Sequence, residues 1–238
     1  MLERAEAANA AKTEFLRTVS HELRQPLNAM AGLLQLWELG LRGTLSPQQV
    51  DDLERIKRNQ QQLATLIEDL LSVARLEAGK LSVTSEPVAI ASLLEGLRAA
   101  VSLDLDARGI EYSIPTVDTS MVAIADPGRL HQVLVNLLTN AMKATSRGDR
   151  VDVTCVAEPD VVRIRVRDNG SGIPSDMLDA IFTPFVQVGR ALNQPREGAG
   201  LGLAISRGLV ETMGGTLGAQ SEVGVGSTFT VTIPRAPA

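Results

Sequence analysis

The sequence is poor in aromatic residues, cysteine and long apolar runs, and each shortage excludes a class of protein. Aromatic side chains make up 3% of the 238 residues, so we expect an aliphatic core of Leu, Val, Ile and Ala. The single cysteine, Cys155, excludes an internal disulfide and fits a reducing compartment without requiring one. No run of about 20 apolar residues is present and no signal peptide opens the chain, so we expect no segment to span a membrane.

The charge balance gives no indication of an anionic partner. The formal net charge is −5, so we expect no nucleic acid partner. Hydrophobic residues account for 44% of the chain and charged residues for 21%, as in ordinary globular proteins. The length suffices for one large or two small domains. We expect a cytoplasmic fragment without membrane contact, whose full-length parent could be anchored upstream.

The first third of the sequence contains two long amphipathic patterns. Apolar residues recur with helical spacing over residues 3–40, and again in a second predicted helix, Pro47–Glu77, which Ser46 would cap. A single helical hairpin leaves both apolar stripes exposed. We therefore expect two copies to pair into a four-helix bundle, which makes the protein a homodimer.

A histidine lies on the polar face of the first predicted helix. His21 points away from the apolar stripe, Glu22 follows it, and Pro26 removes a backbone donor one turn later. A neighbouring glutamate can hold an imidazole in one tautomer and take up its proton. An isolated histidine on a solvated face usually has no function, so this signal depends on the rest of the chain.

From residue 81 onward, short apolar strands alternate with helices. Strands are predicted at Leu81–Thr84, Ile110–Ile114, Val122–Ala125, Val151–Val156, Val161–Arg167, Thr216–Gln220 and Ser227–Ile233. Helices are predicted at Ile90–Ala107, Pro127–Thr145, Ser175–Ile181 and Gly200–Met213. This order predicts an α+β sandwich that follows the all-α helical hairpin.

The helix predicted at Pro127–Thr145 carries a narrow polar stripe on an otherwise apolar surface. The stripe consists of Arg129, Gln132, Asn136, Asn140 and Lys143. Amide oxygens can ligate Mg²⁺, and a lysine can meet phosphate as a point charge. The alternative is a plain solvated stripe. His131 points to the apolar side, where we expect it to pack in the core.

Two glycine-rich segments follow on the chain. Asp168 opens the sequence DNGSGIP directly after an apolar strand, where a buried carboxylate can accept a hydrogen bond from an exocyclic amine such as that of adenine. A common turn is the alternative. The second segment, EGAGLGLAI, opens an apolar helix whose N-terminal N–H groups suit phosphate. The preceding loop, 186–197, contains Arg190 and Arg196 and is predicted to be a mobile flap.

In this order, the segments resemble the sensor histidine kinases of bacterial two-component systems. SHELRQPL resembles the family's H box, NLLTNAMKAT the N box, DNGSGIP the G1 box, FTPF the F box, EGAGLGLAIS the G2 box and GSTFTVTIP the closing strand. The resemblance covers nearly the whole chain. It implies a dimerisation and histidine phosphotransfer domain in residues 1–80 and a catalytic ATP-binding domain of the Bergerat type in residues 81–238.

The resemblance also implies the reaction and its partners. ATP would phosphorylate His21, with Glu22 as the acid–base residue, and the phosphoryl group would pass to an aspartate of a response regulator receiver domain. ATP and Mg²⁺ are the implied cofactors. Asn140, assisted by Asn136, would serve the Mg²⁺ site, and Lys143 would contact phosphate.

The remaining implied residues belong to the nucleotide pocket and its lid. Asp168 matches the family's adenine-recognising aspartate. The pocket glycines are Gly170, Gly172, Gly198, Gly200 and Gly202, and the residues of the lid and F box are Phe182, Phe185, Arg190 and Arg196. The two phenylalanines could equally serve ordinary core packing.

Two positions depart from the family pattern, and two other functions stay open. Gln25 stands where the family commonly has Thr or Asn, so phosphatase activity toward the regulator is not implied. Ala199 stands where the family frequently has threonine. A dimeric adaptor without phosphoryl transfer, and an ATPase that drives conformational change, are the alternative functions.

Overall fold

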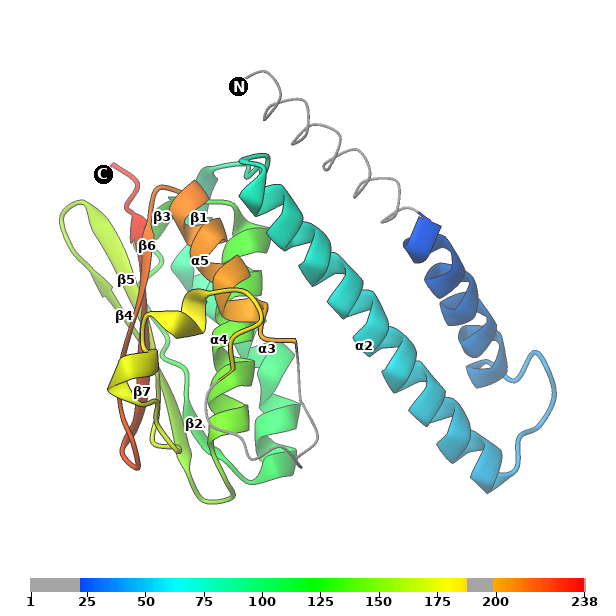
Figure 1. Ribbon diagram of the computed structural model, residues 1–238. Coiled ribbons are helices and arrows are strands. Elements are labelled where there is room, and N and C mark those ends of the chain that lie inside the picture. The colour runs from blue at the N-terminus through cyan, green and yellow to red at the C-terminus, as the bar shows by residue number, and fades with distance from the viewer. Residues whose placement is uncertain (1–21, 188–198, 238) are drawn as a thin grey trace. The chain divides into compact units, whose positions relative to one another are not determined.

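A computed structural model describes residues 22–187 and 199–237 of the chain. The chain divides into two compact units, Met1–Lys80 and Leu81–Ala238, and each is considered by itself (Figure 1). In the described parts of both units, no helix is long and apolar enough to cross a bilayer.

The first unit is a hairpin of two helices. A helix occupies residues 22–38, and α2 follows at Pro47–Glu77. The Ser46 side chain accepts a hydrogen bond from the Gln49 N–H, while the Gln49 side chain accepts one from the Ser46 N–H. This reciprocal cap confirms the predicted start of the second helix and satisfies N–H groups that have no partner in the helix.

Polar contacts fix the antiparallel register of the hairpin. Arg24 pairs with Glu68 at 2.7 Å, and the Gln60 side chain donates to the Leu27 carbonyl at 3.1 Å. Gln60, which interrupts the apolar pattern of α2, therefore serves as an interhelical contact. Helical structure continues through Pro26 in the described residues.

The second unit combines one large sheet, one small sheet and a layer of helices. The five-stranded sheet has the order β2-β4-β5-β7-β6, and β1 pairs with β3 in a separate ladder. Strand bounds are β1 Glu86–Ala89, β2 Glu111–Ser113, β3 Val122–Ala125, β4 Arg150–Ala157, β5 Val161–Asp168, β6 Thr216–Glu222 and β7 Gly226–Pro234. The β2–β4 pair is parallel and all other pairs are antiparallel. The predicted α+β sandwich is thus confirmed.

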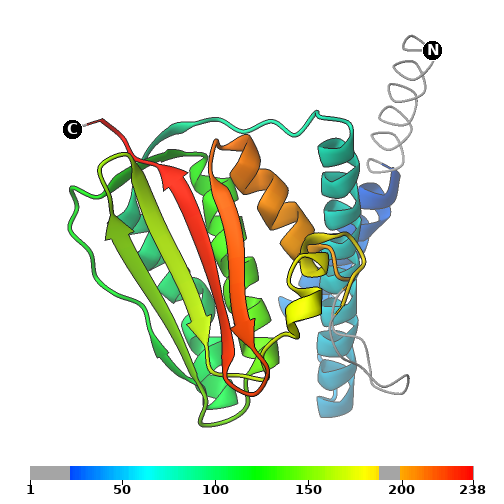
Figure 2. The same ribbon diagram turned by 60° about the vertical axis from the view of Figure 1, so that its left-hand side comes forward.

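The helices α3 (Ile90–Arg108), α4 (Pro127–Ala144) and α5 (Gly202–Thr212) cover one face of the large sheet (Figure 2). Alternate residues of the central strands point into this layer and are buried, including Val162, Ile164 and Val166 of β5 and Phe229, Val231 and Ile233 of β7. The period of two along a strand thus brings one apolar face of the sheet against the helices. His131 of α4 is half-buried and lies beside Gly96 of α3, as its apolar side predicted.

Three sequence predictions about local structure are wrong. Residues 81–85 form no strand, because β3 is only long enough to pair with Glu86–Ala89. The helix predicted at Ser175–Ile181 is two short 3₁₀ turns, Ser175–Met177 and Ala180–Phe182, since so short a segment cannot sustain an α-helix alone. Gly200 has φ +71°, a left-handed conformation, so α5 begins only at Gly202.

Candidate functional site

The H-box segment is described from Glu22 onward. His21 lies outside the described residues, as do Arg190, Arg196 and Gly198. The side chains of Glu22 and Gln25 are exposed on the helix at residues 22–38. Both side chains are therefore accessible in the single chain.

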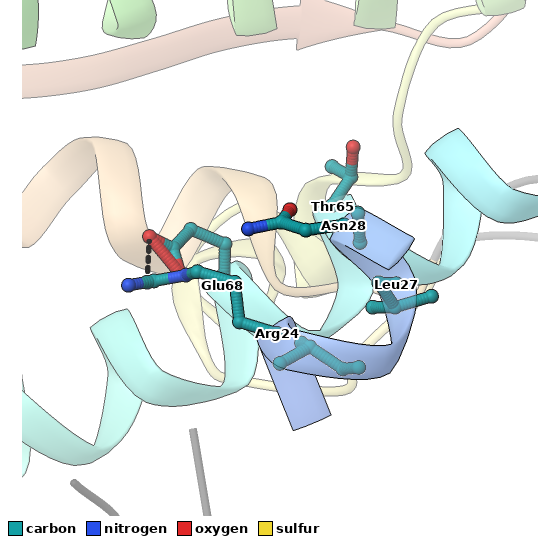
Figure 3. Close-up of a pocket in the computed structure, with 7 residues that line it drawn as sticks. Arg24, Leu27, Asn28, Thr65 and Glu68 are labelled. Atoms are coloured by element: carbon teal, nitrogen blue, oxygen red, sulfur yellow. Dashed lines mark hydrogen bonds and ion pairs between the residues drawn. The ribbon is translucent and has the colours of Figure 1, made fainter. Parts of the chain in front are cut away.

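A groove of about 310 Å³ runs between the two helices of the hairpin. It is lined by Arg24, Leu27, Asn28, Ala64, Thr65, Ile67 and Glu68 (Figure 3). The Arg24 guanidinium bridges both carboxylate oxygens of Glu68, at 2.8 and 2.7 Å. Because both side chains are about half exposed, this pair contributes little stability and leaves its charges accessible.

In the second unit, one face of α4 contacts both glycine-rich segments. Asn136, Asn140 and Ala144 are spaced four residues apart and so share this face. The Asn136 amide nitrogen donates to the Ser206 hydroxyl of α5 at 2.9 Å, and the Ala144 carbonyl accepts from the Ser171 N–H at 3.0 Å. Asn140 lies between these two contacts and is half-buried. Lys143 is exposed beside the end of the helix.

The carboxylate of Asp168 ends strand β5 in a buried position, with 3% of its surface exposed. Its Oδ1 accepts hydrogen bonds from the backbone N–H groups of Gly170, at 3.0 Å, and of Ser227, at 3.2 Å. Among the described residues, Oδ2 accepts no hydrogen bond, and every buried side-chain nitrogen or oxygen has a partner, so Oδ2 keeps contact with the surface. Oδ2 therefore remains available to a hydrogen-bond donor from a ligand.

Burial raises the pKa of Asp168 above the ordinary value for an aspartate. The N–H groups of Gly170 and Ser227 oppose this effect, and the nearby charge of Asp149 adds to it. The carboxylate is thus held by backbone donors in a place where its charge is poorly solvated.

The turn after Asp168 has no room for side chains at its glycines. Gly172 has φ +70°, and a Cβ there would overlap the Glu222 carbonyl at the end of β6. A Cβ on Gly170 would overlap the Ala144 carbonyl at the end of α4. The turn is therefore packed between α4 and the β6–β7 hairpin. This packing explains why glycine, which has no Cβ, occupies both positions.

The F-box phenylalanines differ in their surroundings. Phe182 is half-buried, with the Arg207 guanidinium of α5 5.1 Å from its ring centroid. Phe185 is 63% exposed and has φ +67°, and its N–H donates to the Gly200 carbonyl at 2.9 Å. Core packing is therefore the wrong explanation for Phe185. This contact brings together the described ends of the segment that the sequence predicts as a flap.

Gly202 lies under the amide of Asn136 at the start of α5. An added Cβ would lie 2.9 Å from Asn136 Cγ and 3.0 Å from its Nδ2, and it would overlap Oδ1. Ser206, one turn later on α5, is 2% exposed. Ser206 was not among the predicted site residues; the available signal was a hydroxyl four residues after Gly202, among apolar residues of the helix.

The donor types of this site suit only certain metals. Within the described residues, no group of three or more His, Cys, Asp or Glu side chains could hold a metal ion. Asparagine oxygens, together with water and the phosphates of a bound nucleotide, match the ligand preference of Mg²⁺. The residues present therefore fit Mg²⁺ bound jointly with a phosphate ligand.

Comparisons with known families agree with this arrangement. The family model "His Kinase A (phospho-acceptor) domain" matches residues 11–79. The model "Histidine kinase-, DNA gyrase B-, and HSP90-like ATPase" matches residues 125–237. The hairpin and the α/β unit thus each correspond to a described domain family.

The similarity to known proteins extends over both domains of this chain. The aerobic respiration control sensor protein ArcB of Escherichia coli (strain K12) is 36% identical over 230 residues, which cover 96% of this chain and 29% of ArcB. The virulence sensor protein BvgS of Bordetella bronchiseptica is 41% identical over 242 residues, which cover 96% of this chain and 19% of BvgS.

Among solved structures, full-length ShkA in complex with AMPPNP has a TM-score of 0.76 and 35% identity. The match covers 94% of this chain and 46% of the ShkA chain. In each case, the chain spans less than half the length of its relative. The chain belongs to the histidine kinases, and it corresponds to the catalytic core of a sensor histidine kinase.

Proposed function

We propose that this chain transfers the γ-phosphoryl group of ATP to His21 and then to an aspartate of a response regulator receiver domain. The hairpin, residues 1–80, serves as the dimerisation and phosphotransfer domain, and residues 81–238 serve as the ATP-binding domain. The observation that carries the proposal is the position of Asn140, between hydrogen-bonded contacts from α4 to both glycine-rich segments.

The nucleotide binds in the second unit under this proposal. Asp168 Oδ2 accepts a hydrogen bond from the exocyclic amine of adenine. Because two backbone N–H groups hold Oδ1, the carboxylate is fixed in one orientation, with Oδ2 toward the ligand. Phosphates lie toward the glycine segment that includes Gly200 and Gly202, where the first N–H groups of α5 are unpaired within the helix. Lys143 supplies a positive charge near the phosphates. Gly198, Arg190 and Arg196 complete the lid.

Asn140 would hold Mg²⁺ through its amide oxygen, with Asn136 assisting, together with water and the phosphates. When bound, the ion neutralises negative charge on the phosphates. The asparagines would orient it, and Gly170 and Gly202 pack closely against α4 on either side of Asn140. No other described side-chain cluster competes for the ion.

Phosphoryl transfer then proceeds in line to an imidazole nitrogen of His21. The lone pair of that nitrogen forms the P–N bond as the bond from the γ-phosphorus to the bridging oxygen breaks, and ADP leaves. Glu22 takes the proton from the other ring nitrogen, or holds it in a hydrogen bond. In the second step, an aspartate oxygen of the regulator replaces the nitrogen on phosphorus.

We further propose that the hairpin pairs with a second copy. Exposed apolar side chains recur every seven residues on both helices, as Leu23, Met30 and Trp37 on the first and Ile56, Leu63 and Leu70 on the second. A period of seven is typical of helices that bury a seam against other helices. The exposed charges of the adjacent groove are suited to contact with the regulator.

The decisive experiment uses ATP labelled at the γ position. We expect acid-labile label on the wild-type chain and none on His21→Ala, because P–N bonds hydrolyse in acid. His131→Gln is a matched control, since His131 is the other of the two histidines and packs beside α3. This variant should retain the label.

The other outcomes separate the alternative functions. Free phosphate without labelled protein would support an ATPase, and nucleotide binding without turnover would support an adaptor. Binding of a fluorescent ATP analogue should be measured in parallel, so that a failure of transfer is distinguished from a failure to bind ATP. Label that persists on His21→Ala would contradict the proposed phosphoacceptor.

A further inference from the structure

We propose that Ser206 is a positioning residue of the nucleotide site, which acts through Asn136. This inference rests on the proposed nucleotide site but not on phosphoryl transfer. The Ser206 hydroxyl holds the Asn136 amide in place and thereby fixes the first turn of α5 relative to Asn140.

The first observation is a hydrogen bond between two helices that joins a buried hydroxyl to a half-buried amide. Ser206 is 2% exposed, and its hydroxyl oxygen accepts from Asn136 Nδ2 at 2.9 Å. The two residues are 70 positions apart in the sequence. A buried hydroxyl without a partner would be destabilising, so this hydrogen bond selects one orientation of the amide.

The second observation is the close fit of the amide against the backbone. Gly202 and Ser206 are one turn apart and therefore share a face of α5. Asn136 fills the space above Gly202, where a Cβ would lie 2.9 Å from Asn136 Cγ. The amide is thus held from two sides, by a hydrogen bond at one turn of α5 and by backbone contact at the preceding turn.

The position of this contact explains why it matters for the ligand. Gly202 opens α5, whose first N–H groups have no partners within the helix and are the groups proposed to bind the phosphates. Asn140 is one turn from Asn136 on the same face of α4. The Ser206–Asn136 bond therefore fixes the spacing between the Mg²⁺-binding amide and the phosphate-binding helix end.

The test measures the affinity of a fluorescent ATP analogue, with Mg²⁺ and with EDTA, for the wild-type chain and for Ser206→Ala. Loss of the hydrogen bond should lower the affinity for the analogue about five- to tenfold when Mg²⁺ is present. The decrease should be smaller in EDTA. The matched control is Thr212→Val. The Thr212 hydroxyl donates to the Gly208 carbonyl of its own helix, at 2.7 Å, and has no other hydrogen bond to the described residues, so this variant should bind as the wild type does.

A double-mutant cycle shows whether Ser206 acts through Asn136. In the background of Asn136→Ala, the further change Ser206→Ala should alter the affinity less than about twofold. Urea denaturation of each variant reports folding separately. A purely structural role would lower stability and leave the ratio of affinities with and without Mg²⁺ unchanged.

Additive effects in the cycle, or an unchanged affinity in Ser206→Ala, would overturn the inference. So would a wild-type chain that binds no nucleotide. If the wild type binds nucleotide but His21 is never labelled, while Ser206→Ala still weakens binding, the proposed function fails and the inference stands.

Discussion

The two oxygens of Asp168 have different surroundings, and this difference gives the residue its proposed role. Oδ1 accepts two backbone hydrogen bonds, whereas Oδ2 accepts none from the described residues. The backbone therefore fixes the carboxylate and leaves one oxygen for the ligand. Burial makes the charge costly, so the site retains a charged group that the fold alone would not favour.

Asp168→Asn should separate binding from stability. The amide can still accept from Gly170 and Ser227, but it presents an NH₂ group where an acceptor is needed. We expect nucleotide affinity to fall by about 10- to 100-fold, the range for a hydrogen bond to a charged group. Titration with a fluorescent ATP analogue measures this change, and near-wild-type affinity would contradict adenine recognition by Asp168.

The thermal stability of the same variant should depend on pH differently from that of the wild type. Burial places the folded-state pKa of Asp168 above its unfolded-state value, so the wild type loses stability as pH rises through that folded-state pKa. The ligand-free variant should therefore melt higher than the wild type at neutral pH. This advantage should vanish below about pH 4, where the carboxyl is protonated in both states. A difference in Tm that does not vary with pH would contradict the assignment.

Cys155 provides a second test at the residue scale. Burial raises the pKa of its thiol to about 12, and it is the only cysteine of the chain. The thiolate fraction at pH 8 should be about 10³-fold lower in the native protein than in the unfolded chain. Reaction with an aromatic disulfide reagent should therefore be slow until urea unfolds the protein. Rapid native reaction would show that β4 does not shield the thiol.

At the scale of elements, α4 connects the parts of the proposed nucleotide site. Its buried side fills the core with Leu130, Val133, Leu134, Leu137, Leu138, Ala141 and Met142. Its polar side contacts α5 through Asn136 and the Asp168 turn through Ala144. Because the core fixes the helix, the two glycine-rich segments are held at a defined separation.

Gly202→Ala tests this packing between elements. The added methyl would overlap the Asn136 amide, which we expect to cost about 1–3 kcal/mol of stability and to weaken nucleotide binding. Gly128→Ala is the matched control in the first turn of α4. There, a Cβ would lie 3.6 Å from Asp126 Oδ1, an ordinary contact, so alanine should stabilise the helix by up to about 1 kcal/mol. Urea denaturation and nucleotide titration would show whether the two variants differ in this way.

At the scale of the whole molecule, the described part of the hairpin, residues 22–80, exposes apolar surface. Leu27 and Leu34 are buried, whereas Leu33 is 52% exposed and Leu63 is 47% exposed. One hairpin therefore buries only part of its apolar stripes. A second copy would cover the remainder and allow one protein to present two phosphoacceptor helices.

Leu63→Glu should convert the proposed dimer to a monomer, because it places a charge in the apolar seam. Light scattering after size exclusion measures the mass directly. Trp37, the single tryptophan, is 37% exposed in one chain, so its emission should shift to the red when the dimer dissociates. Gln61→Glu, an exposed position on the side of α2 opposite Leu63, should remain dimeric. A wild-type chain that is monomeric at high concentration would contradict the proposed pairing.

Local signals in the sequence were sufficient to predict most of the helices and strands. Apolar periodicity predicted α3, α4 and the main strands, and Ser46-Pro47 predicted the start of α2. The wrong prediction at residues 81–84 concerned a strand, which requires a partner elsewhere in the chain. Thr84 instead donates its N–H to Asp126 Oδ2, a contact that no local pattern indicates.

The sequence by itself determined the amphipathic hairpin, the order of the motifs and the glycine positions, because these depend on spacing and backbone conformation. Only the tertiary structure decided which groups meet: Asn136 with Ser206, Gly170 with Ala144, and Asp168 with Ser227. Such contacts join segments far apart in the chain, and they follow from how the helices pack on the sheet.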